Sequence, residues 1–498
     1  MPVADPPIAA LILAAGMGTR MKSALPKVLH PLLGRPLVSY PIEAAQTAGA
    51  SRLMIVLGHG AEQVRTQLQQ DFPQGLDTTI QAEQRGTGDA TRCGVEALGA
   101  FSGYFLILYG DTPLLTAPVL RALIEPTLAA RAQLGLLVSA KPDATGYGRI
   151  LRDGLGRVVG IREQKDCSPA ERQITEWNPG IYLISSAFFH TAIGQLNTDN
   201  AAGELYLTDL VAIAAKHSQA EPGVVAIPWP AEDLEGINNR QELAAREAVL
   251  RKRVLGSHAL AGVTIRDPES TYIDAAVTLG EDVIIEPQVH LRGSCHIAAR
   301  VHIDVGCVLT NVTVQSGTHL RPYTVASDSA IGENARIGPF THLRPGSQLA
   351  SDTHVGNFVE LKNTRLGQGS KANHLAYLGD GQVGAKVNVG AGVIFCNYDG
   401  FNKHQTVLED GVFVGSDSQL VAPVTVGQGA YIGTGTTITQ DVPAEALAIG
   451  RARQSNKAGW GSRLRARLQS IKAAQALEQN AEPGKPADQG KPSDDGTP

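Results

Sequence analysis

The chain has 498 residues, which is too long for a single hydrophobic core and predicts two or more domains. Its hydrophobic content of 43% and charged content of 18% are typical of a folded globular protein rather than a disordered one. The net charge of −5 and the aromatic content of 5% argue against nucleic acid or a membrane surface as a partner.

The cysteines and the N-terminus indicate a cytoplasmic protein. The cysteines are scattered without a CxxC pair, so the sequence favours neither a zinc site nor a disulfide framework; they are Cys93, Cys167, Cys295, Cys307 and Cys396. The N-terminus has no basic region, and the apolar run that follows it is too short to cross a bilayer. We therefore expect reduced thiols, no signal peptide and no transmembrane helix.

The first part of the chain alternates short apolar runs with amphipathic stretches. The runs "AALIL", "RLMIVLG", "YFLILYG", "LGLLVSA" and "GIYLIS" predict buried strands, and residues 37–48 and 61–70 predict helices between some of them. This order indicates an α/β domain with a parallel or mostly parallel sheet covered on both faces. Ligands of such sheets bind beyond the carboxyl ends of the strands.

A glycine turn follows the first strand, in "LAAGMGTRMKSALPK". The third glycine of a dinucleotide fingerprint is missing, and no GK[ST] of a P-loop follows. Glycines let backbone N–H groups approach an anion, and Arg20 and Lys27 supply positive charge beside them. This segment therefore predicts a phosphate site.

A carboxylate, Asp111, stands where the strand "YFLILY" ends. Such a residue is often only a turn or cap residue, and "GDTP" fits that interpretation too. Its place on the same edge as the glycine turn favours a metal ligand, since Mg²⁺ takes one or two protein oxygens besides phosphate and water.

Residues 238–260 combine strong helix formers with no proline, which predicts a long helix. Either it joins two halves of the chain or it packs inside the first domain. We divide the chain into a nucleotide-binding domain over 1–237, this linker helix over 238–260, a repeat domain over 261–460 and an extension over 461–498.

A period of six residues begins near residue 261, with "VTLGED", "VIIEPQ" and "VHLRGS" among its copies. An aliphatic residue at a fixed place in each hexad predicts a parallel β-helix. In the extension, residues 463–477 suggest a basic amphipathic helix, and the Pro/Gly-rich residues from about 480 predict disorder.

One stretch interrupts the hexads and concentrates polar side chains, which are Lys362, His374, Tyr377, Asn388, Asn397 and Tyr398. Interruptions of a repeat are often functional loops. Acyl transfer from a thioester to an amine needs a base of near-neutral pKa, so His374 is the candidate. The alternative is a coil that serves only as a rigid spacer and oligomerisation device.

The motifs of both halves resemble one enzyme family. "QAEQRGTGDA", "YGDTPLL", "EWNPGIY", "EGINNR", "GNFVELK" and "KANHLAYLGD" are similar to the bifunctional N-acetylglucosamine-1-phosphate uridylyltransferase / glucosamine-1-phosphate N-acetyltransferase family. The resemblance implies a Rossmann-like nucleotidyltransferase domain followed by a left-handed β-helix. It also implies acetylation of glucosamine-1-phosphate by acetyl-CoA, and then Mg²⁺-dependent uridylyl transfer from UTP for envelope synthesis.

The resemblance also implies roles for individual residues of the first half. Lys27 and Arg20 would neutralise phosphate, while Asp111 and Asn238 would bind Mg²⁺. The residues implied to hold UTP or the product are Leu13, Ala14, Ala15, Gly16, Lys27, Gln81, Gly86, Thr87, Tyr109, Gly110, Asp111, Gly148, Glu163, Asn178 and Asn238. Among them, Gln81, Gly86 and Thr87 would read the uracil.

For the second half, the resemblance implies that His374 takes the amine proton. Glucosamine-1-phosphate would bind to Arg344, Lys362, Tyr377 and Asn388, and acetyl-CoA to Ala391, Asn397, Tyr398, Ser416, Thr434 and Arg451. Thr434 stands where we expect Ala, so we expect a backbone contact there. The family forms homotrimers. The alternatives are a monofunctional sugar-1-phosphate nucleotidyltransferase with a structural β-helix, and a scaffold without enzymatic activity.

Overall fold

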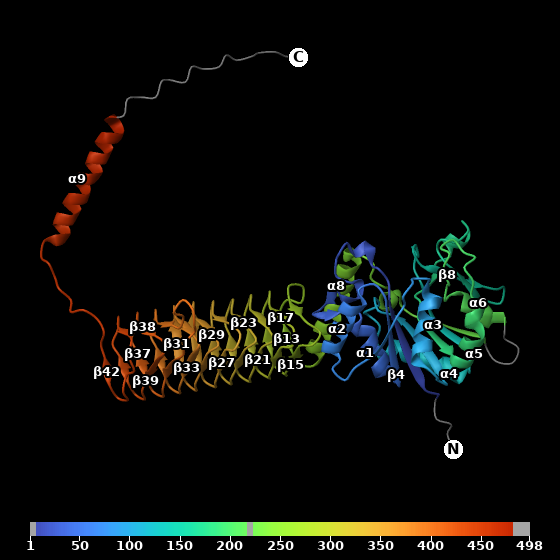
Figure 1. The fold of residues 1–498 in the computed structure, drawn as a ribbon, viewed down its shortest axis with the longest axis horizontal. Helices are drawn as coiled ribbons and strands as arrows, with labels where there is room; N and C mark the ends of the chain where they lie inside the picture. Colours follow the sequence, from blue (N-terminus) through green and yellow to red (C-terminus); the bar gives the residue numbers. More distant parts are fainter. Residues whose placement is uncertain (1–5, 217–222, 482–498) are drawn as a thin grey trace, which may run out of the picture.

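The computed structural model describes residues 6–216 and 223–481. Figure 1 shows a rounded N-terminal part that continues into a straight rod, with the helix α9 (Trp460–Ala481) standing away from the rod's far end. The helix predicted over 463–477 is thus present. The disorder predicted from about residue 480 concerns residues 482–498, which lie outside the described residues.

Four parallel strands form one side of the N-terminal sheet, in the order β5 (Asp77–Ile80), β4 (Arg52–Leu57), β1 (Ile8–Ala14) and β6 (Tyr104–Tyr109). Every residue of β1 is buried, as its continuous apolar sequence predicts. The main helices of this domain are α1 (Ser39–Ala48), α2 (Ala61–Asp71), α3 (Thr87–Leu98), α4 (Ala117–Ala129), α5 (Ser186–Ala192) and α6 (Asp209–Lys216).

The other side of the sheet is mixed. The strand β11 (Tyr182–Ser185) runs antiparallel to both β6 and β7 (Leu134–Ala140), and β12 (Val224–Pro228) pairs parallel with β7. The remaining strands are antiparallel, and they are β10 (Glu176–Asn178), β8 (Gly148–Arg152) and β9 (Val158–Arg162). The apolar run of β11 predicts a buried strand but carries no information on its direction.

The rod is a parallel β-helix with three faces. The first sheet runs from β13 (Thr264–Ile265) to β42 (Leu447–Ala448), the second from β14 (Tyr272–Ile273) to β41 (Thr437–Ile438), and the third from β15 (Thr278–Leu279) to β39 (Val424–Val426). Aliphatic side chains such as Ile303, Leu309 and Val314 fill its interior and are fully buried. The aliphatic residue at a fixed place in each hexad of the sequence therefore corresponds to this interior stack.

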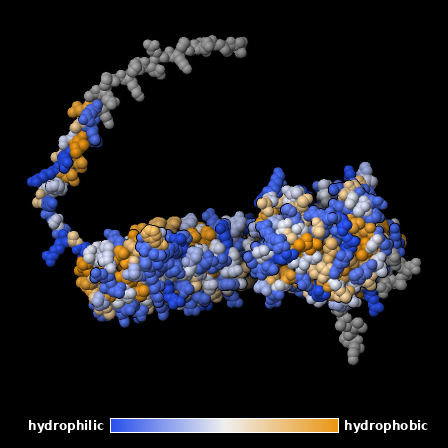
Figure 2. Space-filling model, viewed as in Figure 1, coloured by the Kyte–Doolittle hydropathy of each residue, from blue (hydrophilic) through white to orange (hydrophobic). Residues whose placement is uncertain are grey.

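The rod's outer surface is mostly hydrophilic on the face drawn in Figure 2, with hydrophobic residues gathered toward the end nearest α9. Tyr431, Leu447 and Ile449 are exposed in this region. Within residues 6–216 and 223–481, no helix is both long and apolar enough to cross a membrane.

The helix α8 (Arg240–Leu260) contacts both parts of the chain. Asn239 caps it, because its side-chain oxygen accepts a hydrogen bond from the Glu242 N–H at 2.9 Å. Leu243 and Leu250 pack against the first domain, whereas Leu255 is buried in the core of the rod.

Burial in the rod predicts the effect of a cavity. Leu309→Ala removes a fully buried side chain from the coil interior and should cost about 2–5 kcal/mol of stability. Thermal unfolding followed by circular dichroism measures this loss. The matched control is Thr310→Ala on the same strand, since Thr310 is only partly buried. An equal loss from both substitutions would contradict the stacked-core interpretation.

Candidate active sites

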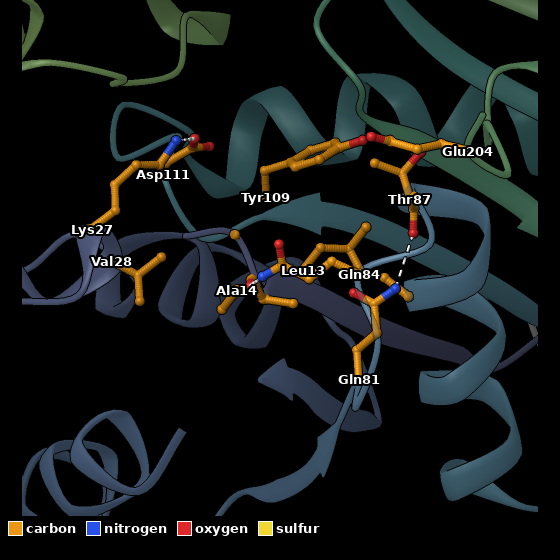
Figure 3. A pocket seen from close by; sticks show the side chains of 14 residues that line it. Leu13, Ala14, Lys27, Val28, Gln81, Gln84, Thr87, Tyr109, Asp111 and Glu204 are labelled. Carbon is orange, nitrogen blue, oxygen red and sulfur yellow. Dashed lines mark hydrogen bonds and ion pairs between the residues drawn. The ribbon is translucent and has the colours of Figure 1, made fainter. Parts of the chain in front are cut away.

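The first candidate site lies beyond the carboxyl ends of β1 and β6, where a cavity of about 330 Å³ opens (Figure 3). Its walls are formed by Leu13, Ala14, Ala15, Gly16, Lys27, Val28, Gln81, Gln84, Gly86, Thr87, Ala90, Tyr109, Asp111 and Glu204. All but four of these are residues that the sequence predicted for the nucleotide.

A second cavity, of about 540 Å³, adjoins the first and shares Thr87, Tyr109, Asp111 and Glu204 with it. The predicted residues Arg20, Gly148, Glu163, Asn178 and Asn238 line it. Gly110 is the one predicted residue of this group that lines neither cavity. Its N–H donates to the Leu13 carbonyl oxygen at 3.0 Å and so ties β6 to β1.

Positive charge and oxygen ligands meet at the border of the two cavities. Lys27 forms an ion pair with Asp111, and its Nζ lies 3.3 Å from Oδ1 of Asn238. Arg20 donates to the same amide oxygen at 2.9 Å. Both oxygens therefore face a cation already, and a carboxylate with an amide oxygen is a donor set that suits Mg²⁺.

The glycine turn brings Lys27 to this point. Gly18 has a positive φ of 61°, and a Cβ there would lie 2.5 Å from Cβ of Lys27, so only glycine fits. The segment that carries Asn238 is held in place by a hydrogen bond of 2.9 Å from the Ile237 N–H to the Asp111 carbonyl oxygen.

Sequence reasoning missed Gln84 and Glu204. Gln84 donates from Nε2 to the Ala15 carbonyl oxygen at 2.7 Å and so joins the glycine turn to the loop before α3. Its place inside "QAEQRGTGDA" is a signal that identifies it. Glu204 lies far along the chain, in a segment without a distinctive pattern.

The second cavity also contains a partly buried acid. Glu163 accepts a hydrogen bond from the Thr208 hydroxyl at 3.1 Å. Burial raises the pKa of Glu163, and the Thr208 hydrogen bond opposes this rise only in part. Asn178 is fixed nearby, because its Nδ2 donates to the Tyr182 hydroxyl at 2.6 Å.

The second candidate site lies on the rod. Several predicted residues form one column along the corner between the first and second sheets, and they are His374, Ala391, Ser416, Thr434 and Arg451. Backbone hydrogen bonds tie successive coils along this column, from Gly392 N to His374 O at 3.4 Å and from Gly435 N to Ser416 O at 2.9 Å. Arg451 also donates to the Thr434 carbonyl oxygen.

His374 ends the strand β31 (Lys371–His374), and its side chain is exposed. Its Nδ1 lies 3.0 Å from Oδ1 of Asn357 on the preceding coil. Because an amide oxygen only accepts, Nδ1 carries the proton and Nε2 is left as the basic nitrogen that faces outward.

Three cations gather where strands of the second sheet end, on the side of that sheet away from the His374 corner. Lys362 lies beside Lys403, and this like charge lowers the pKa of Lys403. Arg344 donates to Glu360 at 2.8 Å, and this hydrogen bond raises the pKa of the Arg344 guanidinium. These groups suit a phosphate. Lys403 was missed by sequence reasoning, although it lies in the loop that interrupts the hexads.

Asn397 and Tyr377 converge over Gly379, where a Cβ would lie 2.6 Å from Nδ2 of Asn397 and 2.5 Å from the Tyr377 hydroxyl. Asn397 is held by Asp380, which accepts from its Nδ2 at 2.6 Å. Tyr398 is exposed. Asn388, in contrast, begins a strand of the first sheet, away from the cations of the second.

The chain is similar to known transferases in both halves. Residues 10–199 match the MobA-like NTP transferase domain, and residues 405–440 match the bacterial transferase hexapeptide (six repeats), which agrees with a left-handed β-helix. The bifunctional protein GlmU of Sorangium cellulosum is 54% identical over 93% of this chain and 98% of its own length.

Two further relatives carry the same description. The bifunctional protein GlmU of Trichlorobacter lovleyi is 49% identical over 91% of this chain and 97% of its own. That of Anaeromyxobacter dehalogenans is 44% identical over 98% of this chain and 99% of its own. The similarity thus covers both candidate sites.

The raised pKa of Glu163 predicts that the stability of the protein depends on pH. Since the native state keeps the Glu163 proton to a higher pH than the unfolded chain, the free energy of unfolding falls as pH rises above the ordinary Glu pKa of 4.5. Glu163→Gln should therefore raise the melting temperature at pH 7.5 but not at pH 4. Glu83→Gln, which alters an exposed side chain, is the control. A shift independent of pH would contradict the assignment.

Proposed function

The chain belongs to the GlmU family of bifunctional proteins, and from this premise we propose which of its residues perform the two reactions. The protein is a bifunctional enzyme of UDP-N-acetylglucosamine synthesis, with acetyltransferase and uridylyltransferase activities. The observation that supports the residue assignment best is the meeting of Lys27, Asp111 and Asn238 at one point between two adjoining cavities.

In uridylyl transfer, a phosphate oxygen of N-acetylglucosamine-1-phosphate attacks the α-phosphorus of UTP and pyrophosphate leaves. The attacking group is already an anion, so no protein nucleophile is needed. Arg20 and Lys27 contribute by neutralising phosphate charge, and the backbone of Leu13 to Gly16 holds the nucleotide in line.

The oxygens of Asp111 and Asn238 would hold Mg²⁺, because they already converge on the Lys27 ammonium. When bound, the ion stabilises negative charge on the phosphate oxygens. Occupation by a divalent ion would release Lys27 toward the phosphates.

We assign the first cavity to the nucleoside and the second to the sugar. Gln81, Gly86 and Thr87 line the first cavity and would contact the uracil. Gly148, Glu163 and Asn178 line the second and would contact the N-acetylglucosamine.

In acetyl transfer, the amine of glucosamine-1-phosphate attacks the thioester carbon of acetyl-CoA, and the CoA thiol leaves. Nε2 of His374 would take the amine proton, while Asn357 holds the ring. Arg344 and Lys362 would bind the sugar phosphate, with Lys403 as a third cation. Tyr377 and, from a neighbouring copy of the rod, Asn388 would contact the sugar. The column from Ala391 to Arg451, with Asn397 and Tyr398, would contact acetyl-CoA.

A homotrimer is supported by a ladder of exposed apolar side chains at the same corner of the rod, next to the column that contains His374. Tyr323, Phe340, Phe358 and Leu375 succeed one another there, and all four are exposed with a positive φ. Tyr323 stacks on Phe340 at 5.2 Å, and Phe340 on Phe358 at 5.5 Å. The left-handed conformation costs about 1–2 kcal/mol per residue, which contact with neighbouring copies would offset.

We place the enzyme in the cytoplasm, where its substrates UTP and acetyl-CoA are made, and its described cysteines are all free thiols. We keep the domain division at 1–237, 238–260, 261–460 and 461–498. The contacts of α8 with both parts support a linker role for 238–260.

Two single substitutions should separate the reactions. Asp111→Ala should lower uridylyl transfer about 100-fold or more, since one preorganised charge is lost at the phosphates. His374→Ala should lower acetyl transfer by about 100-fold or more. Pyrophosphate release and thiol release measure the two steps. Each variant should keep the other activity, and loss of both from either change would contradict independent sites.

The trimer proposal predicts a charge-sensitive surface. Phe358→Glu places a carboxylate within the exposed ladder and should dissociate the assembly to a monomer, measured by light scattering after size-exclusion chromatography. Acetyl transfer should fall with it, whereas uridylyl transfer should persist. Gln348→Glu adds the same charge on the third sheet and is the control. A trimer retained by Phe358→Glu would contradict this interface.

A further inference from the structure

A buried carboxylate lies behind the wall of the first cavity. Asp89, in the first turn of α3, is 1% exposed and lines neither cavity. It accepts hydrogen bonds from Nε2 of Gln81 at 2.9 Å and from Nη2 of Arg92 at 2.6 Å. Arg85 approaches the same carboxylate at 3.4 Å.

The hydrogen bonds of Gln81 determine which way its amide faces. Nε2 donates to Asp89 and to the carbonyl oxygen of Gly86 at 3.2 Å, and Figure 3 shows the second of these bonds. A carbonyl and an ionised carboxylate only accept, so the NH₂ group must lie on their side. The amide oxygen of Gln81 is therefore the polar atom that faces the cavity.

The carboxylate of Asp89 stays ionised in its buried position. Burial alone would raise its pKa, but the hydrogen bonds from Gln81 and Arg92 and the charges of both arginines outweigh this and lower it. The first turn of a helix also favours a negative charge. A protonated acid would be able to donate to Gln81 and so permit the opposite orientation of the amide.

We propose that Asp89 is a positioning residue for pyrimidine selection, which locks Gln81 so that only its carbonyl oxygen meets the base. The proposal rests on the assignment of the uracil to Gln81 above. Uracil carries a hydrogen on N3 and can donate to this oxygen. Cytosine has a lone pair on N3, which would face the oxygen unpaired, so CTP is rejected.

The test compares kcat/KM for UTP and CTP, each with N-acetylglucosamine-1-phosphate. Asp89→Asn keeps the volume, but its NH₂ can donate to a reversed Gln81 amide while its oxygen accepts from Arg92. Only the 3.2 Å bond to the Gly86 carbonyl oxygen then still opposes the reversal. The UTP/CTP ratio should fall about tenfold or more. An unchanged ratio in a folded variant overturns the proposal. A change in total activity without a change in the ratio also overturns it.

Arg92→Lys is the matched control, because it alters one partner of Asp89 but keeps the positive charge that holds the carboxylate ionised, and it leaves the bond to Gln81. Its UTP/CTP ratio should stay within about twofold of the parent ratio. If Asp89→Asn does not fold, Asp89→Ser replaces it, since a hydroxyl both donates and accepts and cannot fix the amide. A parent enzyme without preference for UTP over CTP would instead contradict the assignment of the base to Gln81.

Discussion

The register between β1 and β6 is the constraint on which the first site depends. Leu13 lies directly opposite Tyr109 in this parallel pair, and the Gly110 N–H donates to the Leu13 carbonyl oxygen. Both strands therefore end at the same level, with the glycine turn on one and Asp111 on the other. Neither strand end provides a cavity by itself. A shift of one residue in the pairing of β1 with β6 would reverse the side-chain faces and separate the glycine turn from Asp111.

A different constraint determines the shape of the rod, because every coil must repeat the outline of the one before it. Outward positions of successive coils consequently form columns, so residues far apart in sequence, such as His374 and Arg451, lie along one corner. The candidate site on the rod is therefore a row of side chains from successive coils. Irregular loops enter only where the hexads stop, and Lys403 and Asn397 both belong to such an interruption.

The sequence predicts the parts of this molecule that repeat or that end a buried strand. The hexads predict the β-helix, and the buried runs predict the strands that present Gly16 and Asp111. It does not predict that β11 runs antiparallel, because direction depends on the tertiary path of the chain. Nor does it predict Glu204, which only the folded chain brings to the cavity, or Asp89, whose proposed role depends on the orientation of the Gln81 amide.

The contacts between the two halves lie far from the second candidate site. The hairpin of β2 (Pro31–Leu32) and β3 (Arg35–Pro36) follows Lys27 directly, and the Leu33 carbonyl oxygen accepts from Ala275 N at 3.0 Å. Arg251 of α8 lies over the Tyr272 ring, 4.5 Å from its centroid. These contacts reach only the first coil of the rod, whereas His374 lies much farther along it (Figure 1). Since each coil contacts only its neighbours, a movement at Lys27 could reach His374 along one rod only through every intervening coil.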